Sequence, residues 1–390
     1  MKISFLSAHS MNSIPMLVGL MRELGTSFRV FAYHIRVKEY AQLPSSVTER
    51  PFRTLQNRKE ILGRSRLFNL RRYVYLNYHI LKQVLAGNQV IYCTDDTVML
   101  MVLLYCKFFG KKKNTVIVYH EFENVDKKNK LTTRIEQGMK LNTNLIDLVI
   151  APEPNRLMFL LNNLRLTAGK GMMVPNTCDA PDENTNVHPA FQNIPGDSVK
   201  LLHVGSIGAE GHYFEELLRA LPLSWTLILV GTVSDGQMEL VTKYKQQKQI
   251  VLISQVPHKE LASIYRGADL GLILYKGVDF NHEYCAPNKL YEFWSFGLPV
   301  IAHSLKGLQS VFVHPFQGKL FDFTGAGLQE ELTSWAKTVN LQADSTELRS
   351  FFKDHLLIST YADDLKEVLT NYLKRNEKSL SDSRYTARTY

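Results

Sequence analysis

The stretch from Asn281 to Ser304, NHEYCAPNKLYEFWSFGLPVIAHS, constrains the fold more than any other part of the chain. It begins as a polar loop with Pro287 near its end. Helical periodicity follows over Lys289–Ser295, then a break at Gly297–Pro299 and a short apolar run, Val300–Ala302. These patterns predict a loop, a helix and a buried strand in succession. The backbone N–H groups at the helix start are then available to an anion such as phosphate.

Two charged residues lie near the start of this predicted helix. Lys289 falls in the first turn, where a lysine is unfavourable for the helix dipole, so its presence suggests a bound anion. Glu292 falls one turn later on roughly the same face, and carboxylates commonly accept hydrogen bonds from ribose hydroxyls. An ordinary loop–helix–strand unit with a solvated Lys and Glu explains the spacing equally well, because helix starts bind anions without further machinery.

The run APNKLYEFWSFGLPVIA resembles the donor-nucleotide signature of the GT-B glycosyltransferases, specifically the retaining group 1, family-4-like enzymes. The resemblance implies that the loop and helix start hold the diphosphate of a UDP- or GDP-linked sugar and that Glu292 binds its ribose. The implied diphosphate-binding residues are Ala286, Pro287, Asn288, Lys289 and Leu290. Many members carry an earlier glutamate near the sugar. Tyr284 stands at that position here, so Tyr284 and its neighbour Glu283 are candidate sugar contacts.

The chain as a whole has 390 residues and 45% hydrophobic content, enough to bury two cores. The longest apolar run, Val98–Phe109, is too short to span a bilayer and contains Lys107, so we expect a buried helix there. The N-terminus enters a strand pattern directly and shows no cleavable signal. Four cysteines without metal-ligand spacing indicate free thiols in a reducing, cytoplasmic compartment.

The net charge of +9 is unevenly distributed. Residues 1–175 carry 26 Lys and Arg against 12 Asp and Glu, a net charge of +14. Residues 176–390 carry 20 against 25, a net charge of −5. A basic half favours a negatively charged partner, which is either nucleic acid or an anionic membrane surface. Solubility alone also accounts for such a charge.

The most basic stretch, Arg50–Arg72, interleaves eight Lys and Arg with leucine, isoleucine and phenylalanine. A basic amphipathic segment suits an anionic membrane interface, so we expect a protein peripheral at the inner face of the membrane. The residues predicted to contact the membrane or the acceptor are Arg64, Arg66, Arg71 and Arg72. The alternative is a solvated loop and helix beside the acceptor. We expect no nucleic-acid partner, because no nucleic-acid-binding module accompanies the charge.

The first half of the chain has alternating strand and helix patterns, which predict a doubly wound α/β sheet. Its first turn, SAHSMNSIP, contains no glycine, so a dinucleotide clasp is not expected there. The predicted strands are Lys2–Ser7, Phe28–Tyr33, Gln89–Thr94, Thr115–Tyr119, Leu145–Ala151 and Met172–Pro175.

His120 directly follows the predicted strand Thr115–Tyr119. A residue just past the carboxyl end of a parallel strand lies where open α/β sheets bind ligands. GT-B enzymes often carry a histidine there that faces the donor sugar. The resemblance therefore implies a catalytic role for His120, as for Lys289, and makes Glu121 a further candidate sugar contact. A strand-end histidine bonded to a neighbouring loop is the alternative.

Residues 176–198 lack periodicity and are rich in proline, asparagine and aspartate, which predicts a linker. It would join a first domain, 1–175, to a second, 199–357. A terminal helix over about 358–376 is expected to return to the first domain, as in GT-B enzymes. The polar tail, 377–390, is expected to be disordered.

The second domain opens with a predicted strand, Val199–Val204, followed by a glycine-rich turn. Glycines there let a ligand approach the backbone closely, so Gly205, Ser206 and Gly208 are candidate donor-binding residues. The same spacing often marks only a tight strand-to-helix turn. The later patterns predict strands at Thr226–Val230, Ile250–Ile253 and Leu270–Leu274, and helices at Leu261–Arg266, Leu328–Val339 and Leu348–His355.

The fold implied by the resemblance is GT-B, with two Rossmann-like doubly wound domains facing a central cleft. No Asp-x-Asp triplet, which the other large glycosyltransferase fold uses to hold a metal, occurs in the chain. We therefore expect a metal-independent enzyme without a cofactor, in which Lys289 and helix-terminal N–H groups neutralise the leaving diphosphate. The expected reaction is retaining sugar transfer to a lipid-linked or polysaccharide acceptor, in cell-surface polysaccharide or glycolipid synthesis.

Two other functions are compatible with the sequence. A sugar-nucleotide epimerase of the same fold would need clustered acids and histidines, for which Asp95, Asp96, His120 and Glu121 are the candidates. A binding or scaffold protein without transfer activity is favoured by the glycine turn, which lacks the Arg and Lys that follow it in many family members. The intact Asn288, Lys289 and Glu292 oppose that second alternative.

Overall fold

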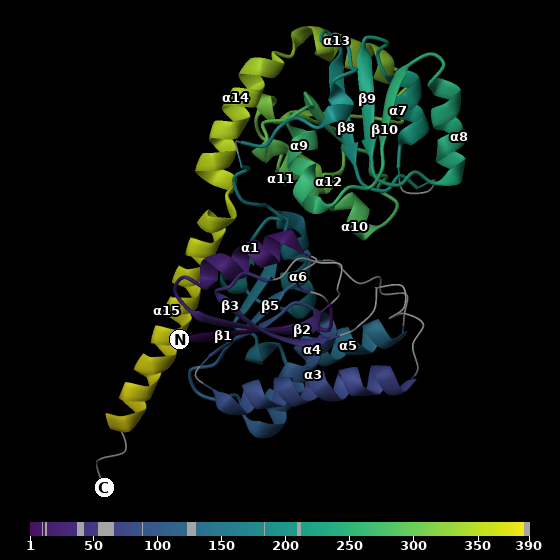
Figure 1. Ribbon diagram of the computed structural model, residues 1–390. Coiled ribbons are helices and arrows are strands. Elements are labelled where there is room, and N and C mark those ends of the chain that lie inside the picture. Colours follow the sequence, from purple (N-terminus) through teal and green to yellow (C-terminus); the bar gives the residue numbers. More distant parts are fainter. Residues whose placement is uncertain are drawn as a thin grey trace. The chain divides into compact units, whose positions relative to one another are not determined.

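The computed structural model describes residues 1–9, 11, 14–36, 43–53, 66–87, 89–122, 130–182, 184–208 and 212–385. They form two compact units (Figure 1). The first unit comprises Met1–Pro175 together with Ile358–Tyr390, and the second comprises Asn176–Leu357. Each unit is a parallel sheet covered by helices on both faces, which confirms the predicted α/β class.

The sheet of the first unit has seven described strands in the order β3-β2-β1-β4-β5-β6-β7, all parallel. Strands β4, β5 and β6 are buried along their whole length, as expected for short apolar runs between two helix layers. The bounds are β1 (Lys2–Leu6), β2 (Arg29–Arg36), β3 (Val47–Arg53), β4 (Val90–Cys93), β5 (Val116–His120), β6 (Leu148–Ala151) and β7 (Gly171–Met173).

Two helices far apart in the sequence, α1 (Pro15–Leu24) and α15 (Ile358–Tyr385), cover one face of this sheet (Figure 1). They pack closely because Gly19 has no side chain: a Cβ there would lie 3.3 Å from Ile358. The other face is covered by α3 (Arg66–Ala86), α4 (Asp96–Phe109), α5 (Lys130–Lys140) and α6 (Pro154–Leu164), with short turns η2 (Thr143–Leu145) and η3 (Ala168–Lys170).

The second unit has six described parallel strands in the order β10-β9-β8-β11-β12-β13. As in the first unit, the order reverses at one point, here between β8 and β11. In open α/β sheets, ligands bind at such a reversal, beyond the carboxyl ends of the strands. The bounds are β8 (Val199–Val204), β9 (Trp225–Val230), β10 (Gln249–Ile253), β11 (Leu270–Ile273), β12 (Val300–His303) and β13 (Gly318–Phe321).

Separate apolar clusters fill the two faces of the second sheet. One face is covered by α7 (Phe214–Ala220), α8 (Asp235–Tyr244) and α13 (Leu328–Thr338). The other is covered by η4 (Pro189–Phe191), α9 (Leu261–Tyr265), α11 (Asn288–Ser295), α12 (Lys306–Gln309), η6 (Pro315–Gln317), α14 (Leu341–Phe351) and the π-helix η7 (Phe352–Leu356). Short helices η5 (His258–Glu260) and α10 (Phe280–Glu283) complete the unit.

Several segments differ from the expectations drawn from the sequence. Residues 176–198, predicted as a linker, lie in the second unit, where Phe191 is buried against Gly267. Helix α15 continues to Tyr385, so residues 377–385, predicted to be disordered, are helical; residues 386–390 lie outside the described part. The last turn of α4, predicted as buried, exposes Phe108 and Phe109.

Candidate functional site

Helix α11 presents its start at the carboxyl edge of the second sheet. Pro287 is the N-cap in extended conformation, and its carbonyl accepts the Leu290 N–H at 3.1 Å. The helix is held by its apolar side chains, among them Phe293, which packs so closely on β11 that a Cβ at Gly271 would lie 2.5 Å from its ring. The first N–H groups of a helix have no intrahelical acceptor, so this packing fixes where they point.

Lys289 and Glu292 form one hydrogen-bonded cluster at this helix start. Lys289 Nζ lies 2.6 Å from Glu292 Oε2 and 3.2 Å from the hydroxyl of Tyr265, which comes from α9. Tyr265 also donates to the same carboxylate oxygen. The other carboxylate oxygen lies 3.9 Å from Nε2 of the exposed His258. Lys289 thus has a counter-ion, and the helix-dipole argument for a bound anion is weakened because Glu292 already offsets its charge.

The electrostatics of the cluster keep Glu292 ionised. Burial raises the pKa of Glu292, but interactions with His258, Lys289 and Tyr265 outweigh it and lower the pKa to about 2. Burial also raises the pKa of Tyr265 well above its usual value, so this hydroxyl keeps its proton and remains a donor. The carboxylate of Glu292 beside Lys289 is therefore negative across the physiological pH range.

The glycine turn after β8 lies at the strand-order reversal of the same sheet. Gly205 has φ +143°, and its carbonyl approaches Gly231 so closely that a Cβ there would lie 2.3 Å away. The Ser206 hydroxyl accepts from Thr232 at 2.8 Å. A Cβ at Gly208 would meet no heavy atom of the described residues within 4 Å. Gly211 lies outside the described residues.

The structure gives other predicted site residues on the second unit definite partners. Glu283 lies 3.5 Å from Lys306, whose ammonium group also lies over the ring of Tyr284, 5.5 Å from its centroid. The Ala286 carbonyl accepts from Asn176 at 2.7 Å. The signature residues and the glycine turn thus follow the adjacent strands β11 and β8. Tyr265 and His258 were missed in the sequence, because neither has a fixed spacing from Glu292.

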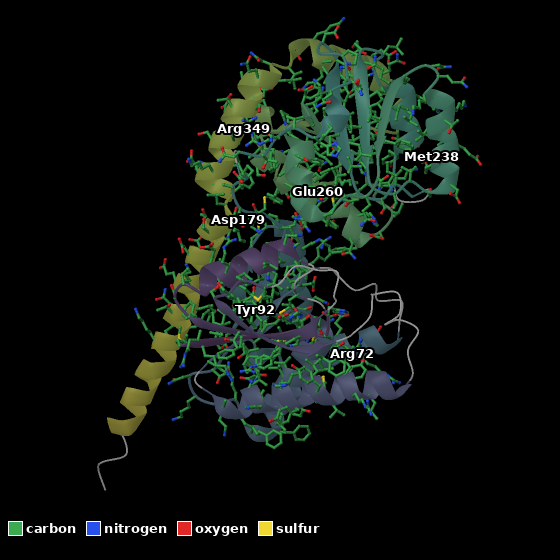
Figure 2. All side chains as sticks on the ribbon, in the orientation of Figure 1. Arg72, Tyr92, Asp179, Met238, Glu260 and Arg349 are labelled. Atoms are coloured by element: carbon green, nitrogen blue, oxygen red, sulfur yellow. The ribbon has the colours of Figure 1, made fainter. Side chains whose placement is uncertain are left out.

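His120 ends β5 in the first unit and is completely buried. Its Nδ1 lies 2.7 Å from the hydroxyl of Tyr92, which lies inside the first unit (Figure 2). Its ring stacks on Phe122 with centroids 4.1 Å apart, and Nε2 has no hydrogen-bond partner among the described residues. Burial lowers the pKa of His120 to about 3, so the imidazole is neutral.

The acids near His120 are bound to the protein itself. Asp95 caps α4 by accepting the Val98 N–H at 3.0 Å, and it also accepts the Ala8 N–H at 2.7 Å. Asp96 accepts a hydrogen bond from the hydroxyl of Tyr119. Glu121 is half-buried, and its N–H donates to Ile150. The first two carboxylates hold strands and helix together, so they do not form the free acid cluster that an epimerase would need.

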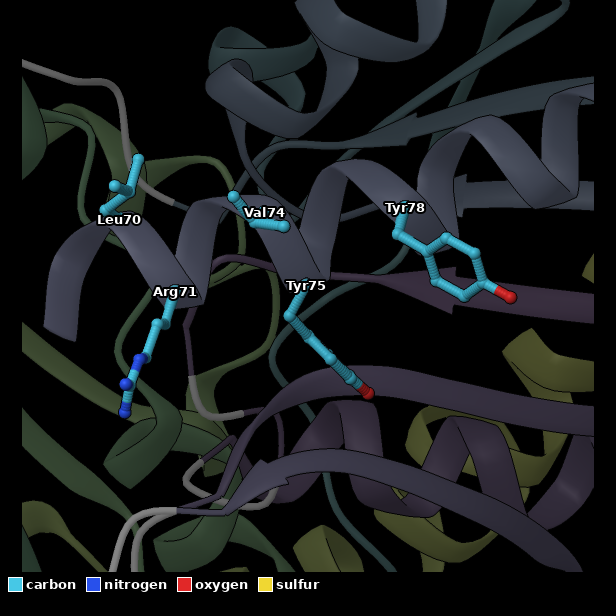
Figure 3. A pocket seen from close by; sticks show the side chains of 5 residues that line it. All are labelled: Leu70, Arg71, Val74, Tyr75 and Tyr78. Atoms are coloured by element: carbon cyan, nitrogen blue, oxygen red, sulfur yellow. The ribbon is translucent and has the colours of Figure 1, made fainter. Parts of the chain in front are cut away.

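The predicted basic segment is not one amphipathic helix. Its first residues, Arg50 and Arg53, belong to the edge strand β3, and α3 begins only at Arg66. Arg64 lies outside the described residues, as does the side chain of Arg66. A surface depression on α3 is lined by Leu70, Arg71, Val74, Tyr75 and Tyr78 (Figure 3).

The exposed side of α3 is apolar as well as basic. Val74 and Tyr78 are 61% and 60% exposed, and Leu70 is 58% exposed. Arg71 is exposed beside them, and the guanidinium of Arg72 lies 5.2 Å from the ring centroid of Tyr73. Within the described residues, no helix is long and apolar enough to cross a membrane. The part of the chain that the structure describes also contains no group of three His, Cys, Asp or Glu side chains placed to hold a metal ion.

Comparison with known proteins matches the second unit to a family and the whole chain to solved folds. Residues 184–347 match the family model described as Glycosyl transferases group 1. HepE from Anabaena, solved with UDP, is similar with a TM-score of 0.66 at 15% identity, covering 95% of this chain and 100% of that chain. None of the curated proteins matches.

Two further solved structures have the same fold. The lipopolysaccharide outer core galactosyltransferase WaaB, in its apo form, is similar with a TM-score of 0.64 at 15% identity, covering 95% of this chain and 100% of that chain. A glycosyltransferase from Rickettsia africae has a TM-score of 0.64 at 11% identity, covering 96% of this chain and 98% of that chain. The predicted fold, two Rossmann-like sheets of the GT-B type, is confirmed, and the predicted signature lies inside the matched family region. The second unit therefore carries a region similar to the glycosyl transferases group 1 family, and the chain has the GT-B fold.

Proposed function

We propose that this glycosyltransferase moves a sugar from a UDP- or GDP-linked donor to a lipid-linked or polysaccharide acceptor, without a divalent metal and with retention at the anomeric carbon. The observation that carries the proposal is the cluster of Lys289, Glu292 and Tyr265 at the start of α11. It joins an ionised carboxylate and an ammonium group to a helix start. The carboxylate suits ribose hydroxyls, and the ammonium group and the helix start suit phosphate oxygens.

The proposed chemistry places the charges where the reaction develops them. As the sugar–phosphate bond breaks, positive charge grows at the anomeric carbon and negative charge on the diphosphate. Lys289 and the N–H groups of the α11 start would stabilise that negative charge in place of a metal. Lys289 has three N–H donors, so it can keep its bond to Glu292 while donating to a phosphate oxygen.

The donor and acceptor classes are supported by the similar proteins. HepE is named in complexes with UDP, with UDP and glucose, and with UDP-glucose, and WaaB is named a lipopolysaccharide galactosyltransferase. These names make UDP-sugars the first donors to test and a lipid-linked glycan the first acceptor. They describe those proteins, and the donor and acceptor of this chain form part of the proposal.

We propose that His120 has a catalytic role next to the donor sugar. We also propose that Glu121, Glu283 and Tyr284 contact the sugar. The unpaired Nε2 of His120 supports this assignment, because a buried polar atom without a partner is rare. Phe122 stacks on one face of the imidazole ring.

The exposed apolar and basic side of α3 supports a peripheral position at the inner face of the membrane, where a lipid-linked acceptor would lie. Leu70, Val74 and Tyr78 can enter the interface while Arg71 and Arg72 meet anionic headgroups. The net charge of +14 over residues 1–175 adds a longer-range attraction to such a surface.

Purified protein incubated with UDP-glucose, UDP-galactose and GDP-mannose tests the proposal. We expect slow release of UDP or GDP from at least one donor, with an unchanged rate after addition of a chelator, and a released sugar that keeps the donor's anomeric configuration by NMR. Activity that disappears in chelator and returns with magnesium would contradict metal independence. Donor binding without release, even with added glycan acceptors, would favour a binding or scaffold role instead.

A further inference from the structure

Three histidines and Tyr275 form a chain of neighbouring rings at the strand-order reversal of the second sheet. His203 is on β8, His212 precedes α7, and His282 is on α10. The ring centroids of His203 and His212 lie 6.1 Å apart, those of His212 and Tyr275 5.9 Å, and those of Tyr275 and His282 5.7 Å. A backbone bridge between His212 and Tyr275 fixes this arrangement.

Two nitrogen atoms in this cluster lack partners. His203 is only 5% exposed; its Nδ1 lies 3.3 Å from the Leu272 carbonyl, and so carries the hydrogen, which leaves Nε2 as an acceptor. Nε2 of His203 and Nδ1 of His212 have no hydrogen-bond partner in the described part of the chain. An unpaired buried polar atom costs about 1–3 kcal/mol. Two such atoms in neighbouring rings therefore indicate that these nitrogens form hydrogen bonds to a bound ligand.

The unpaired nitrogen of His203 faces the glycine turn. Nε2 lies 3.8 Å from the point where a Cβ at Gly205 would stand, and no such atom is there. Gly205 has φ +143°, a conformation that side chains rarely adopt, so this residue leaves the imidazole uncovered on that side. This turn at the reversal between β8 and β11 is where an α/β sheet receives its ligand.

The charged groups that face the pair come from several elements. The charge of Lys289 on α11 lowers the pKa of His203. The charges of His282 on α10 and Lys276 after β11 lower the pKa of His212. All three have carboxylate partners. Lys289 lies 2.6 Å from Glu292, His282 lies 2.8 Å from Asp279, and Lys276 lies 3.8 Å from Glu216. Burial and then the neighbouring His212 and Lys289 lower the pKa of His203 to about 4, although its bond to Leu272 acts in the opposite direction.

His212 has a similar electrostatic balance. Burial is the main cause that lowers its pKa, and His282 and Lys276 lower it further, whereas a hydrogen bond to the Gly208 backbone raises it. Both imidazoles are therefore neutral at neutral pH, and each could accept a proton if an anion arrived to offset the surrounding cations.

We propose that His203 and His212 together take up one proton when a nucleotide sugar binds, and then donate a hydrogen bond to its diphosphate. This inference rests on the proposed function, because it takes the donor diphosphate to lie at the Gly205 turn. The proton comes from solvent and adds to Nε2 of His203 or Nδ1 of His212, so no bond of the donor changes. Only one proton is taken up because two positive rings 6.1 Å apart would repel each other.

The sign of the pH dependence follows from linkage. Without donor the pair binds a proton only in acid, and with donor it holds one at higher pH, so the affinity for donor is greatest in acid. As pH rises, affinity falls up to about tenfold per pH unit until the pKa of the bound pair is passed.

Calorimetry with UDP-glucose and GDP-mannose tests the inference on the intact protein. Nucleotide sugars are chosen over UDP because their diphosphate has no terminal phosphate group that titrates near pH 6. Titrations at pH 6 in two buffers of different ionisation enthalpy should give uptake of about one proton per donor, falling to about zero at pH 9. Binding of either donor without proton uptake at pH 6 would overturn the inference and leave the proposed function standing. No binding of either donor at any pH would overturn both.

Variants locate the proton. His203→Gln and His212→Gln should each reduce the uptake at pH 6 and flatten the fall in affinity between pH 6 and 9. His355→Gln is the matched control, because His355 is an exposed histidine of the same unit; its proton uptake should equal that of the natural protein. Uptake unchanged in both His203→Gln and His212→Gln would assign the proton elsewhere and overturn the inference. The natural protein alone decides whether a proton is taken up, so that result does not depend on how the variants fold.

Discussion

The two units have sheets with the same kind of strand order, which reverses between β1 and β4 in the first and between β8 and β11 in the second. At the first reversal the protein supplies its own anion, the Asp95 carboxylate, which accepts the Ala8 and Val98 N–H groups. At the second reversal it supplies the open Gly205 turn and Nε2 of His203, which has no hydrogen-bond partner among the described residues. A reversal is therefore a ligand site only where the chain does not fill it with its own side chain.

The buried histidines of the two units differ in the same way. His120 and His203 each bond one ring nitrogen to the protein and leave the other without a partner among the described residues. His120 is covered by the ring of Phe122, whereas His203 lies under a glycine. What lies over each imidazole, rather than its own burial, distinguishes the two sites.

The largest expected effect that tests this comparison is stability in acid. Burial keeps the pKa of His120 at about 3 in the folded chain, whereas an unfolded histidine is protonated below about pH 6.5. Below pH 6.5 the unfolded chain thus binds more protons than the folded chain. As the pH is lowered from about 6.5 to about 3, the free energy of unfolding should therefore fall by about 1.4 kcal/mol per pH unit. His120→Asn should remove this loss, because asparagine can still pair with Tyr92.

The three tryptophans separate the units in this measurement. Trp225, Trp294 and Trp335 all lie in the second unit, so their fluorescence follows that unit, whereas circular dichroism follows both. In urea at pH 4.5, His120→Asn should unfold later than the natural protein by circular dichroism, with little change in fluorescence. The same transition midpoint for both proteins would mean that His120 is not a neutral buried group.

A somewhat smaller effect is expected at Glu292 in the second unit. Its pKa of about 2 lies below the usual 4.5, so its stabilisation is complete above about pH 4.5 and is lost as pH falls toward 2. The shift corresponds to about 3 kcal/mol. Glu292→Gln should lower the urea midpoint by tryptophan fluorescence at pH 7, and the difference from the natural protein should shrink by pH 3. Glu215→Gln, at an exposed ion pair with Arg219, is the control. It should leave the urea midpoint unchanged at both pH 7 and pH 3.

Turnover tests whether the buried His120 of the first unit has a catalytic role. If His120 acts on the donor sugar, His120→Ala should lower kcat by about 10²-fold or more, the lower range for a lost acid–base group. Affinity for UDP should stay nearly the same, because the proposed nucleotide site lies in the second unit. His120→Asn, which keeps a partner for Tyr92, shows whether a loss comes from chemistry or from folding. Full activity in both variants would leave His120 a structural residue.

Nucleotide affinity should change by a comparable or smaller amount at Lys289. Lys289→Ala should weaken UDP or GDP binding by about 1.5–3 kcal/mol, the range for hydrogen bonds to charged groups. Lys337→Ala, an exposed lysine on α13, is the matched control. Calorimetry that gives equal affinities for the natural protein and Lys289→Ala would remove this residue from the donor site.

The smallest effect per residue is expected for the membrane contact of the first unit. Each Arg near an anionic surface contributes about 1 kcal/mol, screened over about 8 Å at physiological ionic strength. Changing Arg64, Arg66, Arg71 and Arg72 to Gln should reduce co-sedimentation with anionic vesicles, as should added salt. Changing Leu70, Val74 and Tyr78 to Ser should reduce it in a salt-independent way. No sedimentation of the natural protein with anionic vesicles would favour a soluble acceptor.

The sequence predicted the described interior strands of both sheets and the edge strands β7 and β10, but it missed the edge strands β3 and β13. Continuous apolar runs such as Val116–His120 identify strands, because only a sheet covered on both faces needs them. Strand β3, Val47–Arg53, was missed because it lies at the edge and mixes charged residues with Pro51. Strand β13 was missed because only four residues, beginning with Gly318, form it.

Within the candidate site, the sequence indicated residues but not their partners. The signature placed Lys289 and Glu292 on one helix, and their three-residue spacing allowed the bond that forms. Tyr265 joins them from another helix, which no local pattern could indicate. His203 was overlooked because it reads as part of a buried strand. The available signal was a histidine in an apolar strand two residues before a glycine.

Helix α15 places part of the first unit's core, including Leu365 and Leu369, after the whole second unit in the chain. During synthesis the strands of the first unit emerge first, but the apolar face beside α1 stays uncovered until α15 follows. At about 5–20 residues per second, the second unit alone takes about 10–40 s to emerge. The unit that is synthesised first is therefore completed last, and its apolar face stays exposed to solvent during that interval.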